Sequence, residues 1–128
     1  MFNTNKKVDI PKEFTLFGHK YSVIIKQDLF ETESCYGQAD DDLKQIILQN
    51  VGEVKKIYKE DGKTVEKKMM ITNEILVETF FHEIAHIMLD AAGETKLSGN
   101  EQFVNIIGKA WLEIYLSSVY EKDSQKEV

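Results

Sequence analysis

A long helical segment, expected over residues 73–92, limits the folds open to this chain. Thr72 or Asn73 can cap its first turn, and Glu74 lies within that turn. Gly93 can adopt the left-handed conformation that ends many helices. One stripe of such a helix must be buried, so the rest of the chain has to provide the layer against which it packs.

A second helix is expected over residues 101–120, after a loop over residues 94–100. Apolar residues recur along it at spacings of four, three and four, which indicates one buried face: Phe103, Ile107, Ala110 and Ile114. Trp111 is expected on the buried side as well. The polar residues 121–128 are expected to fray. The second half of the chain is therefore predicted to form two helices that share a core.

The first half of the chain is predicted to form three β-hairpins. Their arms are rich in β-branched and aromatic residues and are separated by turn residues: arms 14–17 and 21–25 around Gly18, arms 36–39 and 45–48 around residues 40–42, and arms 54–58 and 64–71 around Asp61-Gly62. Residues 28–34 fit either a short helical turn or a loop. The charged third hairpin is expected to project into solvent. The predicted fold is one α+β domain, residues 1–128, with a small antiparallel sheet of N-terminal hairpins packed on two helices.

The length, net charge and cysteine content of the chain limit the classes of protein to which it can belong. A chain of 128 residues fits one domain with a core of its own. Lysines cluster at positions 55, 56, 67 and 68, but the formal net charge of −6 argues against nucleic acid or a membrane surface as a partner. The single cysteine, Cys35, can form neither an internal disulfide nor a cysteine-based zinc site, which favours a reducing compartment.

No targeting or membrane segment is expected. The lysines near the N-terminus are not followed by the apolar stretch of a secretory signal. No apolar run approaches the roughly 20 residues that a membrane-spanning helix needs. The expected location is the cytoplasm.

The motif His82-Glu83-Ile84-Ala85-His86 lies in the middle of the first predicted helix. A spacing of four places both imidazoles on one helix face, one turn apart, where two ring nitrogens can bind one zinc ion. The Glu83 carboxylate can then accept a proton from water at the metal, whose pKa zinc lowers towards about 7. An apolar helix rarely carries two histidines and a glutamate that are neither paired nor ligated. The motif therefore predicts a catalytic zinc site.

A catalytic zinc site usually has three protein ligands and one open position. No histidine follows His86, so the third ligand is sought among nearby carboxylates: Asp90, Glu94, Glu101 and Glu113. Glu101 is preferred, because the early residues of a second helix packed antiparallel to the first can face the metal. Glu94 and Glu113 remain alternatives. The capping-box pattern Ser98-Gly99-Asn100-Glu101 also allows Glu101 simply to cap its helix.

Two residues outside the motif also bear on the site. Tyr36 precedes Gly37 in a predicted strand, and its hydroxyl can donate a hydrogen bond to an oxyanion at the zinc. Ordinary packing within the strand is the competing interpretation of this tyrosine. His19 lies far upstream in a predicted turn, where a histidine is more often simply exposed.

The segment Thr79-Phe80-Phe81-His82-Glu83-Ile84-Ala85-His86-Ile87-Met88 resembles the signature of the zincin metallopeptidases. A glutamate that opens the following helix is similar to the gluzincin branch. The layout resembles small prophage-encoded and bacterial zincin-like metallopeptidases, with the immunity-repressor-cleaving peptidases of mobile elements as looser relatives. Only the HExxH segment is specific. The interval from His86 to Glu101 is shorter than in the large gluzincins, and the charged insertion around Asp61-Gly62 has no counterpart in the pattern.

The resemblance implies a zincin-like fold with zinc as cofactor, His82, His86 and Glu101 as ligands, and Glu83 as general base. It implies a hydrolase that cleaves peptide bonds of a narrow protein substrate. The strand over residues 45–48 is expected to be the edge strand that binds this substrate in extended form. Two alternatives remain open: a catalytically inactive zincin-fold binding module of a phage or mobile element, and an interaction protein without a metal. The substrate and the oligomeric state do not follow from the sequence.

Overall fold

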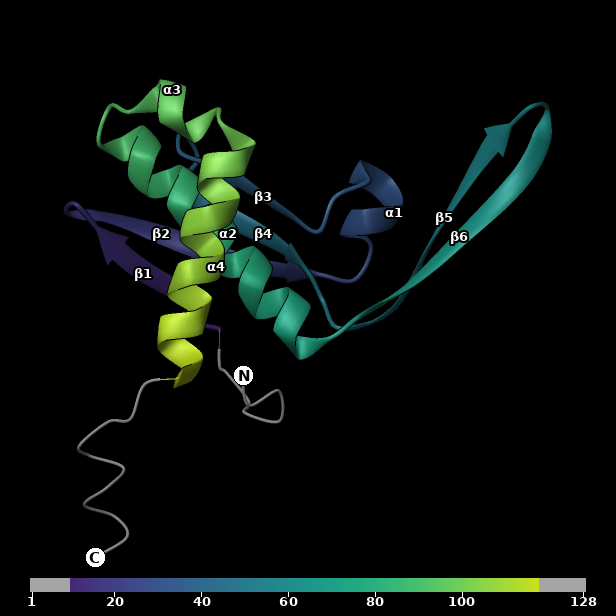
Figure 1. Ribbon diagram of the computed structural model, residues 1–128, viewed down its shortest axis with the longest axis horizontal. Helices are drawn as coiled ribbons and strands as arrows, with labels where there is room; N and C mark the ends of the chain where they lie inside the picture. Colours follow the sequence, from purple (N-terminus) through teal and green to yellow (C-terminus); the bar gives the residue numbers. More distant parts are fainter. Residues whose placement is uncertain (1–9, 118–128) are drawn as a thin grey trace, which may run out of the picture.

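The computed structural model describes residues 10–117. In this part of the chain the elements follow in the order β1 (Glu13–Leu16), β2 (His19–Lys26), α1 (Leu29–Glu33), β3 (Gly37–Asp40), β4 (Gln45–Gln49), β5 (Gly52–Glu60), β6 (Lys63–Ile71), α2 (Asn73–Ala91), α3 (Thr95–Ser98) and α4 (Glu101–Ser117). Figure 1 shows α2 between the sheet of β1 to β4 and helix α4. The fold is α+β, as the sequence predicts. The predicted helical residues 118–120 and the polar tail 121–128 lie outside the described residues.

The main sheet has the strand order β1-β2-β4-β3. The pairs β1–β2 and β3–β4 are antiparallel hairpins, but β2 and β4 run parallel. The prediction of an antiparallel sheet is therefore wrong for the pair that joins the two hairpins. Between β2 and β4 the chain crosses over through α1 and β3, and such a crossover returns the next strand in the same direction. Consequently β4 is an interior strand, the expected edge strand over residues 45–48 is wrong, and β3 lies at the edge.

Two-residue turns with positive φ close the first and third hairpins. Phe17 and Gly18 have φ angles of 51° and 82°, and Asp61 and Gly62 have φ angles of 51° and 77°. Positive φ at both positions is typical of the type I′ turns that match the twist of paired strands. The Asp61-Gly62 turn is confirmed. The first turn begins one residue earlier than predicted, because Phe17 belongs to the turn and His19 begins β2.

The connections contain two short helices. α1 lies within residues 28–34, so the helical alternative for that segment is confirmed. α3 lies within residues 94–100, where the prediction of a plain loop is wrong. Four helical residues are too few to show a 3.6-residue apolar repeat, which is why the sequence pattern misses α3.

α2 has the ends that the sequence predicts. The Thr72 side chain accepts a hydrogen bond from the Ile75 backbone N–H at 3.2 Å, which caps the first turn. At the other end Gly93 has a φ angle of 83°, and its N–H donates to the Asp90 carbonyl oxygen at 3.0 Å. The helix ends at Ala91, one residue before the predicted limit. Within residues 10–117, neither α2 nor any other helix is both long and apolar enough to cross a bilayer.

α2 is buried on two sides. Towards the main sheet its side chains join one apolar cluster with strand residues: Leu76, Phe80 and Ile87 with Tyr21, Ile46 and Leu48. Towards α4 two smaller clusters form: Val77 with Leu112, and Ala85 and Leu89 with Val104. The helix that carries the HExxH motif is therefore packed between two layers.

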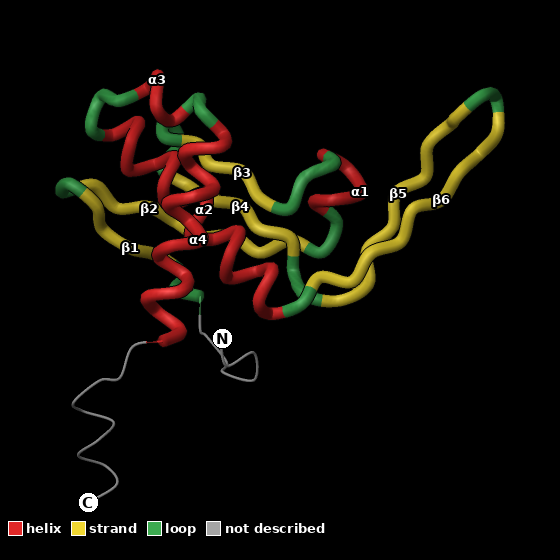
Figure 2. Tube along the Cα trace, in the orientation of Figure 1, coloured by secondary structure: helices red, strands yellow, loops and turns green. Residues whose placement is uncertain are grey.

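β5 and β6 form a separate two-stranded sheet. Figure 2 shows this hairpin extending beyond the main sheet, as the sequence predicts for its charged arms. Its base is anchored, because Val54 and Ile71 are buried in a cluster with Phe30 of α1. The outer part of the hairpin is exposed along both strands.

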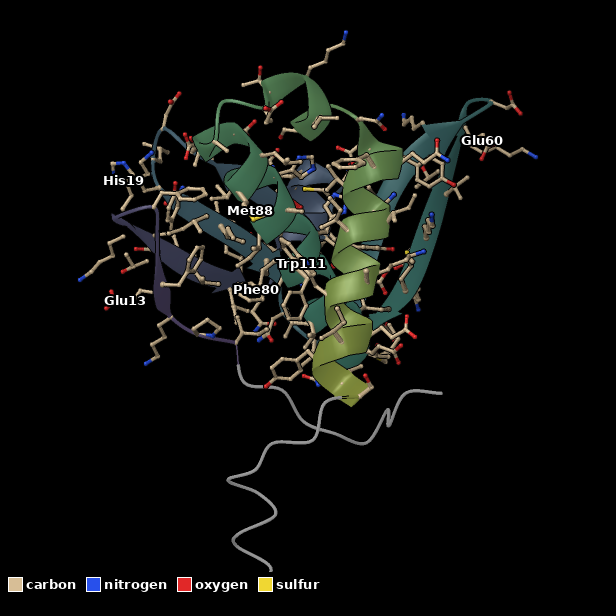
Figure 3. All side chains as sticks on the ribbon, turned by 60° about the vertical axis from the view of Figure 1, so that its left-hand side comes forward. Glu13, His19, Glu60, Phe80, Met88 and Trp111 are labelled. Atoms are coloured by element: carbon tan, nitrogen blue, oxygen red, sulfur yellow. The ribbon has the colours of Figure 1, made fainter. Side chains whose placement is uncertain are left out.

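The predicted buried face of α4 is confirmed in part, because Phe103 and Ile107 pack on the core but Ala110 and Ile114 do not. Its buried residues are Val104, Gly108 and Leu112, with Phe103, Ile107 and Trp111 partly buried beside them. Figure 3 shows Trp111 on the side of α4 that faces α2. Of the predicted face, Ala110 is exposed and Ile114 is 62% exposed. The apolar repeat misses the centre of the buried face because Gly108 has no side chain to count, although α4 comes very close to α2 there.

We expect the hydrogen bond between Tyr21 and Asp41 to stabilise the sheet. Tyr21 is fully buried, and its hydroxyl donates to Asp41 Oδ1 at 2.8 Å. Burial and then this carboxylate raise the pKa of Tyr21 to about 12, while the hydroxyl lowers the pKa of Asp41. Tyr21→Phe should lower the free energy of unfolding by about 1.5 kcal/mol at neutral pH, as measured by urea unfolding. Tyr58→Phe, on the exposed part of β5, is the control and should change it little.

The hydrogen bond between Tyr21 and Asp41 should also make the stability difference between the wild type and Tyr21→Phe depend on pH. Because the pKa of Asp41 is lower in the folded chain than in the unfolded chain, its contribution is full above the unfolded pKa of about 3.9. That contribution is lost as the pH falls through the folded pKa. The unfolding free energies of the wild type and Tyr21→Phe should therefore converge at acid pH. A difference that stays constant from neutral to acid pH would contradict the ionised hydrogen bond.

Candidate metal centre

His82 and His86 lie on the face of α2 that α4 approaches. One helical turn separates them, and their Nε2 atoms are 3.2 Å apart, with ring centroids 4.9 Å apart. Their side chains are 21% and 17% exposed, so both rings are largely covered yet reachable from solvent. The spacing of the motif thus brings two ring nitrogens to one point on the helix surface.

α4 brings Glu101 to the same point. Its Oε2 lies 3.2 Å from Nε2 of His82, and its Oε1 lies 3.1 Å from Nε2 of His86. One ligand atom from each of the three residues lies within 4.8 Å of the others. The preferred third ligand is thus the carboxylate that the structure brings to the histidines.

The other candidate ligands lie elsewhere. Within residues 10–117, the cluster of metal-ligating side chains does not include the remaining carboxylates: Asp90, Glu94 and Glu113. Glu94 is exposed and precedes α3, and Glu113 lies about 18 Å along the α4 axis from Glu101. Figure 3 shows His19 at the end of the β1–β2 hairpin, away from α4.

The three side chains fit a tetrahedral zinc ion. With zinc–ligand bonds of about 2.0–2.1 Å, neighbouring ligand atoms in a tetrahedron lie about 3.3 Å apart. The two Nε2 atoms are 3.2 Å apart, close to this spacing, and each of them lies 3.1 or 3.2 Å from a different oxygen of Glu101. One ligand atom from each residue lies within 4.8 Å of the others, so a small shift of the carboxylate would let one oxygen complete the set. Two imidazoles and one carboxylate also form a donor set found in catalytic zinc sites, which keep a fourth position open.

Ser98 of α3 orients His86. This buried serine has its Oγ 3.1 Å from His86 Nδ1, and it donates to the His86 backbone oxygen at 3.4 Å. Because the hydroxyl proton is used on the carbonyl, Oγ accepts the hydrogen bond from Nδ1–H. With its proton on Nδ1, the His86 ring directs the lone pair of Nε2 at His82 and Glu101. A hydrogen-bond partner on the outer nitrogen is typical of metal-bound histidines.

Asn105 of α4 has the corresponding position beside His82. Its side chain lies beside the His82 ring and acts to raise the pKa of that histidine. The pKa of His82 is lowered, first by burial and then by His86, while Glu101 and Asn105 act in the opposite direction. A lowered pKa keeps the imidazole neutral, and the neutral form is the one that binds a metal.

The capping-box interpretation of residues 98–101 is wrong. Asn100, not Ser98, caps α4, because its Oδ1 accepts from the Phe103 N–H at 3.1 Å. Ser98 belongs to α3, and Glu101 is the first residue of α4, with its carboxylate facing the histidines. Sequence reasoning missed Ser98 and Asn105 as partners of the histidines. A serine or asparagine near a helix start is also an ordinary cap, so the sequence offers no distinctive signal for them.

Glu83 is buried beside the cluster. The residue is 7% exposed, and burial followed by the charge of Glu101 raises its pKa to about 7. It packs against β3, where a Cβ on Gly37 would lie 3.2 Å from Glu83 Cγ and 3.3 Å from Oε2. A carboxyl group in this range of pKa can both take up and release a proton, as general-base chemistry requires.

A cleft of about 530 Å³ opens beside Glu83. α2 and α4 line one side with residues that include His82 and Asn105, and the start of β3 and Met69 of β6 line the other. Its volume is in the range of sites that hold a small ligand or one side chain of a peptide. Cys35 also lines the cleft, and burial raises the pKa of its thiol, which keeps it neutral.

Tyr36 lies in the wall of this cleft. Its hydroxyl donates to Met69 Sδ at 2.9 Å, and its ring stacks on Phe30 with centroids 5.4 Å apart. These contacts place it in the small apolar cluster at the base of the β5–β6 hairpin. An oxyanion role requires the hydroxyl to leave Met69, and that role stays a prediction.

The arrangement joins a cluster of three metal-ligating side chains to a cleft through His82, which belongs to both, and the buried Glu83 also lines that cleft. This combination suits metal-assisted hydrolysis, in which the metal polarises the substrate and the carboxylate moves a proton. No family model matches the chain, and comparisons with curated proteins and with solved structures find no match either.

We expect the chain to bind one zinc ion through these three side chains. His86→Ala and Glu101→Ala should each abolish stoichiometric binding, as measured by elemental analysis after dialysis against zinc. Glu113→Ala, on the same helix as Glu101, is the matched control and should keep the metal. Ser98→Ala should keep the stoichiometry but weaken the affinity about tenfold or more, because His86 Nδ1 loses its partner.

Zinc should also raise the melting temperature of the wild type. A ligand present at 100 times its dissociation constant stabilises the folded state by about 2.7 kcal/mol. A protein that stays metal-free in excess zinc, or a Glu101→Ala variant that retains the ion, would contradict the assigned ligands.

Gly37 should not tolerate even the smallest side chain. A Cβ there would lie 2.5 Å from Cγ2 of Thr79, so Gly37→Ala should lower the free energy of unfolding by about 1–3 kcal/mol. Thr79→Ser removes that methyl group and keeps the hydroxyl that donates to the Ile75 carbonyl oxygen at 2.7 Å. The double variant Gly37→Ala/Thr79→Ser should therefore recover most of the lost stability in thermal unfolding. Equal losses in the single and double variants would show that this contact is not the cause.

Proposed function

We propose that this chain is a zincin-like, zinc-dependent hydrolase that cleaves peptide bonds of a narrow protein substrate in the cytoplasm. One observation carries the proposal: His82, His86 and Glu101 converge at one point beside the buried carboxyl group of Glu83. A structural zinc site is normally closed by four protein ligands, whereas three ligands beside a cleft suit catalysis.

The chain's own residues provide the proton transfers of such a reaction. Zinc held by the three side chains would polarise the scissile carbonyl and lower the pKa of water towards about 7. Glu83 takes the proton from the attacking water and later gives it to the leaving amine, so that the carboxylate is restored after each turnover. Glu83 lies on α2 and packs against Gly37 of β3, which holds its carboxyl group at the cleft beside His82.

β3 is the strand best placed to hold an extended substrate. It pairs with β4 along one side, and it lies at the edge of the main sheet. Gly37 at its start lies against Thr79 and Glu83 of α2. A peptide that adds to this edge would form backbone hydrogen bonds and pass close to Glu83. β4 is unsuited to this role because β2 and β3 pair with its two sides.

Glu83→Gln separates metal binding from catalysis. The variant should retain one zinc per chain, because Glu83 is not among the converging ligands. Its cleavage rate should fall about 100-fold or more, because an amide cannot accept the proton. The measurement is mass spectrometry of a peptide library from a cytoplasmic extract, treated with zinc-loaded wild type or variant. Glu113→Gln, an exposed glutamate on α4, is the control and should cleave like the wild type.

The other outcomes would change the proposed mechanism or replace the proposed function. Equal cleavage by the wild type and Glu83→Gln would rule out Glu83 as the base. Zinc binding without cleavage, together with capture of the same partner by both proteins, would identify a catalytically inactive zincin-fold binding module. A protein that binds no zinc would be an interaction protein without a metal.

A further inference from the structure

The β5–β6 hairpin carries four lysines on two adjacent cross-strand pairs. Lys55 lies opposite Lys68, and Lys56 lies opposite Lys67. We call these two pairs the lysine rungs. Neighbouring pairs of a hairpin point to opposite faces, so one rung faces each way and the ribbon is positively charged all round at this level. Figures 1 and 2 show the ribbon standing clear of the main sheet.

The lysine rungs destabilise the hairpin when nothing is bound to it. Like charges directly opposite each other on paired strands repel, and the ordinary arrangement is a pair of opposite charges. Within residues 10–117, no ion pair involves any of the four lysines. Lys56 donates a hydrogen bond to Ser34 Oγ, which holds the side chain in place without neutralising it. The positive charge is therefore left for a partner to neutralise.

The Lys56–Lys67 rung is one pair farther from the body than Lys55–Lys68, but it faces the same way as the cleft-lining residue Met69. Met69 lines the cleft, and Lys67 is two residues before it on β6, so both side chains point to the same face of the ribbon. Two residues of a strand span about 6.8 Å. A polypeptide whose side chain occupies the cleft would therefore reach the Lys56–Lys67 rung within about two or three of its own residues.

The surrounding charges favour an acidic polypeptide over nucleic acid. Residues 52–71 contain six lysines and four acidic residues, a local excess of two positive charges on a chain with a net charge of −6. The acidic residues are spread along the ribbon and its tip, where they would repel a continuous phosphate backbone: Glu53, Glu60, Asp61 and Glu66. The chain also has no arginine, the residue that most often recognises phosphates and bases by paired hydrogen bonds. Carboxylates on a flexible peptide can instead be placed at the rungs alone.

We propose that the lysine rungs bind an acidic segment of a polypeptide whose neighbouring residues occupy the cleft. That this polypeptide is the substrate rests on the proposed function. The rungs then select the substrate outside the scissile bond, because positive charge on a surface speeds encounter with an acidic segment and orients it. A small cleft and a charged docking ribbon together account for a narrow substrate range.

The test is a binding measurement that needs no cleavage. The full chain carrying Glu83→Gln is titrated into a fluorescein-labelled peptide with six consecutive glutamates beside a leucine-rich stretch, and fluorescence anisotropy reports the affinity. A peptide with six glutamines in place of the glutamates is the matched probe. The glutamate peptide should bind about tenfold more tightly, and raising the salt concentration should remove most of that difference.

Charge reversal on β6 identifies the surface. Lys67→Glu/Lys68→Glu places a carboxylate opposite Lys56 and Lys55, so the rungs become attractive and the hairpin should be at least as stable as in the wild type. The same variant should lose the preference for the glutamate peptide. Lys26→Glu/Lys59→Glu makes the same change in net charge at exposed positions outside the rungs and should retain the preference.

Several results would overturn the docking surface. They are equal binding of both peptides, unchanged preference in Lys67→Glu/Lys68→Glu, or an equal loss in the control variant. Tighter binding of a DNA duplex than of the glutamate peptide would show a general polyanion site and overturn the choice of an acidic polypeptide. Binding as expected together with no cleavage by the zinc-loaded wild type would leave the docking surface intact and reject the hydrolase, so the two proposals can fail separately.

Discussion

The close approach of α4 to α2 at Gly108 sets the geometry of the metal centre. A Cβ at this position would lie 3.1 Å from His82 Cα and 3.2 Å from its backbone nitrogen, a tight contact with backbone atoms that favours glycine where the helices come so near. Two helical turns earlier on α4, Glu101 then reaches both Nε2 atoms at 3.1 and 3.2 Å. The same helix supplies Asn105 to His82. A larger residue at position 108 would move Glu101 and Asn105 together.

The position of Glu83 depends on a second constraint, the parallel pairing of β2 and β4. That pairing sends the chain through α1 and places β3 at the edge of the sheet, against α2. Gly37 at the start of β3 then packs on Thr79 and Glu83, which buries the carboxyl group. The buried base and the edge available to an extended peptide are therefore products of one crossover. An all-antiparallel order would have put β4 at that edge instead.

The β5–β6 hairpin adds little to the core that holds the site. Its base shares a small cluster with Phe30, and its outer part buries almost nothing while it brings like charges together. Folding alone does not explain such an element, because it contributes repulsion and little apolar burial. Its connection to the site is Met69, which lines the cleft at the base of the ribbon and accepts the Tyr36 hydrogen bond.

The features that the sequence determined by itself are local ones, set by residues close together in the chain. His82 and His86 share a helix face because residues four apart always do so, and Thr72 and Gly93 end α2 through hydrogen bonds to their own neighbours. The Asp61-Gly62 turn is local in the same way. The preference for Glu101 came from expecting an antiparallel second helix, but the sequence could not exclude Glu94 or Glu113, because that choice depends on distances between helices.

The tertiary structure alone decided the strand order, the centre of the buried face of α4 and the partners of the two histidines. These features depend on contacts between segments far apart in the chain, which leave no periodic pattern in the sequence. Gly108 acts through the absence of a side chain, so an apolar repeat cannot register it. Ser98 has the sequence position of an ordinary cap, and only the fold of α3 turns it towards His86.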